Sequence, residues 1–118
     1  MADAGLFVGW GAPIAGRETK GLEVFGEAIA FYGSCQEASE IESFETVLLG
    51  AHGGDLSGFF LLRGSEEQCT ALRAREDFQR ITARAALVIN NLGIVDAVID
   101  DGIGAQMAVY QEAIADIV

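Results

Sequence analysis

The chain's only histidine, His52, lies in a glycine-rich turn that reads Ala51-His52-Gly53-Gly54-Asp55. An imidazole changes its charge near neutral pH, so His52 could act as a general base that Asp55 orients. The pair could also begin a metal site, but a catalytic zinc ion normally takes three protein ligands. Because the chain has no second histidine and no clustered cysteines, we predict no metal site. His52 is therefore a candidate catalytic residue, and a solvated turn histidine is the alternative interpretation.

Two charged residues, Asp96 and Arg63, lie in or at the end of predicted strands whose same-face neighbours are apolar. A buried carboxylate costs roughly several kcal/mol unless it is paired. One interpretation is a polar group set in an apolar pocket, with Asp96 as a second candidate catalytic residue and Arg63 as a ligand-binding residue. The alternative is a structural salt bridge or a strand end that reaches solvent.

Three aromatic residues, Trp10, Phe44 and Phe59, are candidate ligand-binding residues, although such side chains more often belong to a core. Trp10 directly precedes a glycine turn, where an indole can line the mouth of a pocket and use its N–H group. That turn, Gly11 to Glu18, has the form of a phosphate-binding loop, but Arg17 replaces the lysine and Glu18 replaces the metal-binding hydroxyl. We therefore predict a simple helix start there, and no bound cofactor.

Composition predicts one globular domain, residues 1–118, because the chain is 51% apolar and has a single proline. Its net charge of −11 repels phosphate backbones and anionic lipid, which disfavours nucleic-acid and membrane partners. The longest apolar stretches fall short of the roughly 20 residues that a membrane-spanning helix needs. The start of the sequence lacks the pattern of a signal peptide. Cys35 and Cys69 lie in apolar helical patterns, so we expect buried thiols and a cytoplasmic protein.

Hydrophobic periodicity divides the chain into strands of period two and helices of period 3.6. A hairpin is predicted around the turn that carries His52, and the second helix begins with a capping box at Ser65. A break in that helix is allowed near Arg73 to Arg75. The predicted strands are Leu6 to Trp10, Ile41 to Leu49, Gly58 to Leu62 and Leu92 to Ile99, and the helices are Gly16 to Ser39, Ser65 to Ala86 and a last one with the stripe Ile103, Met107, Tyr110, Ile114 and Ile117.

This order predicts an α+β fold, a ferredoxin-like βαββαβ sandwich with a four-stranded antiparallel sheet plus a C-terminal helix. Its central strands have no polar face, because Phe59 and Leu61 alternate with Phe60 and Leu62. Two helices cover only one face of such a sheet, and a bare apolar face is larger than a monomer normally exposes. We therefore expect a homodimer that packs through the sheet face, with the C-terminal helix as an alternative source of cover.

Nearly the whole chain resembles the dimeric α+β barrel superfamily, in which two ferredoxin-like subunits pack sheet against sheet. The resemblance lies in the order of the elements and in central strands that are apolar on both faces. The superfamily includes cofactor-free monooxygenases, lactone isomerases, haem-using relatives and members of no known activity, so the fold alone does not select a reaction. The resemblance does imply a pocket between the sheet and the helices of each subunit.

We therefore expect a small cytoplasmic homodimer that binds or transforms an apolar or aromatic small molecule in this pocket, in the manner of a cofactor-free monooxygenase or isomerase. The alternative is a non-catalytic oligomerising or regulatory subunit. Whether the chain is an enzyme stays open at this level.

Overall fold

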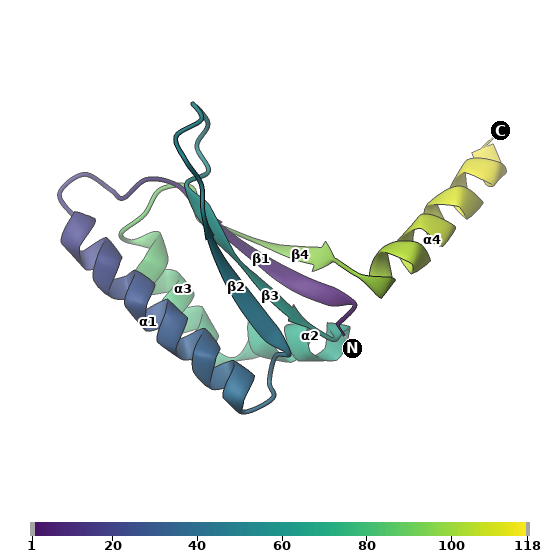
Figure 1. Ribbon diagram of the computed structural model, residues 1–118, viewed down its shortest axis with the longest axis horizontal. Coiled ribbons are helices and arrows are strands. Elements are labelled where there is room, and N and C mark those ends of the chain that lie inside the picture. The colour runs from purple at the N-terminus through teal and green to yellow at the C-terminus, as the bar shows by residue number, and fades with distance from the viewer. Residues whose placement is uncertain (1, 118) are drawn as a thin grey trace.

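A computed structural model describes residues 2–117 as one sheet with helices against it (Figure 1). The element order matches the prediction, including the helix at the end of the chain. The second predicted helix is divided in two, at the place where a break was allowed. The elements are β1 (Ala4–Trp10), α1 (Glu18–Glu37), β2 (Ser43–Leu48), β3 (Gly58–Gly64), α2 (Glu66–Ala74), α3 (Glu76–Ala86), β4 (Gly93–Val98) and α4 (Asp101–Ile117).

The sheet is antiparallel throughout, with the strand order β2-β3-β1-β4. The predicted hairpin is confirmed, because β2 pairs with β3 from Ser43 opposite Arg63 to Leu48 opposite Gly58. The central pair is β1 with β3, in a register that puts Val8 opposite Phe60. Because side chains alternate between the faces of a strand, this register aligns two apolar rows across the sheet, one on each face.

The hydrophobic core lies between one sheet face and the helices. Leu6 and Leu62 are fully buried at the centre of that face, and α1 and α3 lie across it in Figure 1. The two cysteines are buried and free, as predicted. The core cluster consists of Leu6, Val8, Ala28, Tyr32, Cys35, Ile41, Phe60, Leu62, Cys69, Leu72 and Phe78.

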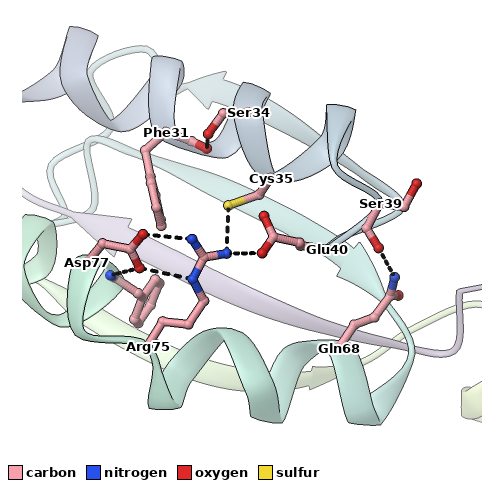
Figure 2. A network of polar contacts seen from close by, with 9 residues as sticks. Phe31, Ser34, Cys35, Ser39, Glu40, Gln68, Arg75 and Asp77 are labelled. Carbon is pink, nitrogen blue, oxygen red and sulfur yellow. Dashed lines mark hydrogen bonds and ion pairs between the residues drawn. The ribbon is translucent and has the colours of Figure 1, made fainter.

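The second helical segment breaks at Arg75, which has the extended backbone angles φ −73° and ψ 139°. The predicted capping box at Ser65 is confirmed, since its hydroxyl accepts from the Gln68 N–H and the Gln68 side chain accepts from the Ser65 N–H. Figure 2 shows the Arg75 guanidinium between Asp77, at 2.7 and 3.0 Å, and Glu40 beyond the end of α1. These ion pairs tie the corner between α2 and α3 to α1, which keeps both helices on the same face.

The opposite face of the sheet is not covered by any helix in residues 2–117 (Figure 1). We call it the open face and define it by Phe7, Val47, Phe59, Leu61 and Val95, which the strand registers place on one side. The Phe7 and Phe59 rings lie 4.9 Å apart there, and Val95 is 55% exposed. The prediction that both sides of the sheet are apolar is therefore confirmed, and α4 does not lie on this face as cover.

Candidate functional site

A cavity of about 250 Å³ lies between the helix side of the sheet and the helices α1 and α3. Its walls are almost entirely apolar, and the loop after β1 contributes Gly11 and Pro13. A concave apolar space with a few polar groups is the usual form of a small-molecule site. The large side chains around it include Val8, Trp10, Leu22, Phe25, Tyr32, Leu48, Phe60 and Ile81.

Regular secondary structure positions the aromatic part of this wall. Trp10 follows Leu6 and Val8 on the helix side of β1, and Phe60 stands opposite Val8 on β3. Phe25 and Tyr32 are seven residues apart on α1, so they share a helix face. Phe25 lies 5.7 Å from the Trp10 ring and 5.6 Å from the Phe60 ring, while Tyr32 lies 5.1 Å from Phe60. Such contacts hold the rings in place and give the cavity a defined shape.

The mouth of the cavity carries two large apolar side chains that face solvent. Leu22 on α1 is 74% exposed and Leu48 at the end of β2 is 70% exposed, and both line the cavity. Gly21 also lines it, and a Cβ atom there would come no closer than 3.9 Å to any neighbour. The polar groups on the wall are few, namely Glu18, Ser57, Thr82 and the polar tips of Trp10 and Tyr32.

Tyr32 supplies the most deeply buried polar group of the wall, since only 2% of the residue is exposed. Its hydroxyl makes no hydrogen bond to any described residue. Among the described residues, however, no side-chain oxygen or nitrogen is both sealed off and without a partner. The hydroxyl therefore keeps some accessible surface, and Tyr32 is a lining residue of the cavity. Burial, and to a smaller extent the nearby Cys35 thiol, raises the pKa of Tyr32, so the group stays a neutral donor.

His52 lies in the exposed loop between β2 and β3 and does not line the cavity. The Gly54 N–H donates to Nδ1 at 3.2 Å, so the proton sits on Nε2, which donates to the Leu56 carbonyl at 2.8 Å. Both ring nitrogens thus form hydrogen bonds within the loop that carries His52. No hydrogen bond joins His52 to Asp55 in the structure of residues 2–117. The role of His52 as a catalytic base stays a prediction.

Asp96 and Arg63 both take part in ion pairs, which was the alternative that the sequence left open. Asp96 is exposed on the edge strand β4 and accepts from Arg73 of α2 at 2.8 Å. Arg63 donates to Glu45 and to Asp100, each at 3.0 Å. Neither Asp96 nor Arg63 borders the cavity. The contacts therefore fit the salt-bridge interpretation, and Asp96 reaches solvent because β4 is an edge strand. A catalytic role for Asp96 stays a prediction.

The candidate ligand-binding aromatics divide between the two faces of the sheet. Trp10 lines the cavity, and Phe44 packs behind its wall, 5.9 Å from Tyr32. Phe59 and Arg63 lie on the open face, so neither lines this cavity. The reason is alternation, since Phe59 and Phe60 point to opposite sides. A role in ligand binding stays a prediction for all four residues.

Sequence reasoning did not select Phe25, Tyr32 or Phe60 as site residues, and the structure places all three on the wall of the cavity. One signal could have selected Tyr32 earlier. It is the one tyrosine of the predicted helix from Gly16 to Ser39, and a buried tyrosine hydroxyl normally needs a partner.

No family model and no curated protein matches this sequence. Solved structures do match its fold. A dimeric ferredoxin-like protein of unknown function from Jannaschia is 13% identical, with a TM-score of 0.63 over 81% of this chain and 99% of that one. A hydroxynitrile lyase from Passiflora edulis is 10% identical, with a TM-score of 0.63 over 86% and 97%. A cofactor-independent oxygenase from Streptomyces nogalater is 16% identical, with a TM-score of 0.56 over 85% and 96%.

The fold is ferredoxin-like, as in these solved structures. At these identities the likeness establishes the fold and leaves the reaction open. Within this fold, the cavity occupies the space between sheet and helices where the resemblance places a pocket. Among residues 2–117 no three His, Cys, Asp or Glu side chains gather as metal ligands, and no helix is long and apolar enough to cross a membrane.

Proposed function

We propose that the protein is a cytoplasmic homodimer that binds a small aromatic molecule, one bearing a hydrogen-bond acceptor, in the cavity of each subunit. The observation that carries this proposal is the buried Tyr32, which lines a largely apolar, aromatic wall and whose hydroxyl bonds to no described residue. A ligand without an acceptor would leave that donor unsatisfied, and one with a carbonyl or similar oxygen would pair with it.

The size and composition of the site support a compact ligand. A space of about 250 Å³ is near the lower end of small-molecule pockets, so it suits one or two fused rings. Trp10, Phe25 and Phe60 offer ring faces and edges for stacking. Exposed Leu22 and Leu48 would cover the ligand at the mouth.

Chemical transformation of the ligand is the finer part of the proposal. A neutral tyrosine that donates to a carbonyl oxygen favours the build-up of negative charge on that oxygen. Two of the similar structures are a hydroxynitrile lyase and a cofactor-independent oxygenase. The proposal for this chain is restricted to binding with polarisation of the acceptor, and His52 and Asp96 remain separate candidates for proton transfer.

The homodimer half of the proposal rests on the open face. Its apolar side chains, Phe7, Phe59 and Leu61 among them, are only half-buried in one copy. A second copy would cover them by packing its own open face against the first, at the spacing of about 10 Å that stacked sheets adopt. The dimeric description of a similar protein from Jannaschia supports a homodimer.

A second candidate function, a non-catalytic oligomerising subunit, is favoured by the same open face together with the exposed helix α4. A thermal-shift screen with aromatic ketones, 1-tetralone among them, separates the two. Ligand binding should raise the midpoint of unfolding in a concentration-dependent manner. A full panel without any shift would contradict the binding function and favour the oligomerising one.

A further inference from the structure

Helix α4 is an apolar helix with no buried residue. Its stripe repeats at intervals of four, three, four and three residues, the spacing that keeps side chains on one helix face. An isolated helix of this length is marginal in water, and Gly102 and Gly104 weaken it further. The stripe consists of Ile103, Met107, Tyr110, Ile114 and Ile117, which are 43 to 85% exposed.

The base of α4 is firmly attached to the sheet. The Ile99 N–H donates to the Asp3 carbonyl at 3.3 Å, and Arg63 holds Asp100 by an ion pair at 3.0 Å. Asp100 has a positive φ of 48°, and a Cβ on Gly102 would lie 2.2 Å from the Asp3 carbonyl oxygen. The turn is therefore specified by close contacts, so α4 leaves the sheet in a defined direction.

That direction leads away from the body of the subunit. Figure 1 shows α4 standing clear of the other elements, on the side of the sheet opposite α1 and α3. The radius of gyration is 16.2 Å, against about 13.5 Å for a compact domain of this length. The accessible surface of 7294 Å² exceeds the value for a compact monomer of 12.5 kDa by about 1,100 Å². A standard protein interface takes about 800 Å² from each partner.

We propose that α4 is an arm that clasps a second copy of this chain, with the stripe packed on the partner subunit beside the joined open faces. The open face and the stripe are two apolar surfaces of one chain without cover, and α4 lies on the open side of the sheet. A second copy carries the same two apolar surfaces, so each copy can cover the open face and the stripe of the other. In a two-fold symmetric dimer, every contact made by one α4 is repeated by the other. The excess surface is large enough for such an interface.

This inference rests on the proposed homodimer and adds the element that would hold it together. The test compares Met107→Glu, at the centre of the stripe, with Ala108→Glu, which adds the same charge on another side of the same helix. Glutamate is a good helix former, so neither substitution should melt α4. Sedimentation equilibrium gives the dimer dissociation constant of each full-length variant, and circular dichroism reports the fold.

We expect Met107→Glu to weaken the dimer by about 100-fold, because each dimer would lose the burial of two such side chains. Ala108→Glu should change the dissociation constant by less than threefold. A dimer that tolerates both substitutions equally would overturn the role of α4 and leave the homodimer itself intact. A wild-type chain that stays monomeric at micromolar concentrations would overturn both proposals, and would assign the stripe to its own sheet or to a different partner.

Discussion

The rings of Tyr32 and Phe60 meet edge to face, with their centroids 5.1 Å apart, and join α1 to the central strand β3. This contact forms part of the wall of the cavity, because both residues line it. It also holds the Tyr32 ring in place, and only 2% of Tyr32 is exposed. The aromatic core and the candidate site are thus built from the same side chains, so the site should be as rigid as the core.

Filling the mouth of the cavity should block ligand binding without harm to the fold. Gly21 lines the cavity and has room for a side chain, so Gly21→Leu should weaken binding of 1-tetralone by at least about tenfold in calorimetric titration. The matched control is Gly21→Ala, which adds only a methyl group at the same helix position. It should bind normally and raise the free energy of unfolding by about 0.5 to 1 kcal/mol. Normal binding by the leucine variant would place the ligand elsewhere.

Replacing His52 by alanine tests the catalytic candidate that the sequence offered. Because both ring nitrogens bond within the β2–β3 loop, we expect His52→Ala to leave the affinity for 1-tetralone within twofold of wild type. The free energy of unfolding should fall by about 1 kcal/mol or less, since the lost hydrogen bonds are exposed. If a reaction of a bound ketone is found, a large loss of turnover at unchanged affinity would assign His52 to proton transfer, against the expectation from its position.

Stability should decline at alkaline pH because of buried groups that resist deprotonation. Burial raises the pKa of the Cys35 and Cys69 thiols in the folded protein. The unfolded chain then releases these protons at a lower pH than the folded chain, so the free energy of unfolding is unaffected below pH ~8 and falls above it. Denaturant titrations from pH 7 to 10 should show this slope, and the double variant Cys35→Ala, Cys69→Ala should flatten it. An equally steep decline in the double variant would contradict the assignment.

Hydrophobic periodicity, together with the turn and capping motifs, was sufficient to predict the element order, the hairpin, the capping box at Ser65 and the apolar open face. These features depend on local pattern, and alternation in β3 alone predicts that Phe59 and Phe60 face opposite sides. The site was harder to predict, because it depends on register and on strand order. Asp96 sits on an apolar row in the sequence, but β4 is an edge strand, and the Arg73 side chain that pairs with it belongs to α2.

The position of α4 also lay beyond sequence reasoning. The stripe was visible as a pattern, and two alternatives for the cover of the sheet were open, a second subunit or α4 itself. The turn at Asp100 and the close approach of Gly102 to Asp3 decide where the helix goes, and neither contact leaves a signal in local periodicity.

The central claim is that the Tyr32 hydroxyl donates to an acceptor on a ligand in the cavity. Calorimetric titration of wild type and Tyr32→Phe with 1-tetralone and with tetralin, which has the same ring system without the ketone oxygen, tests it most directly. We expect wild type to prefer the ketone by about tenfold, as one buried hydrogen bond allows, and Tyr32→Phe to lose that preference while it binds tetralin normally. A ketone preference that survives in Tyr32→Phe, or the absence of binding by either compound, would contradict the account.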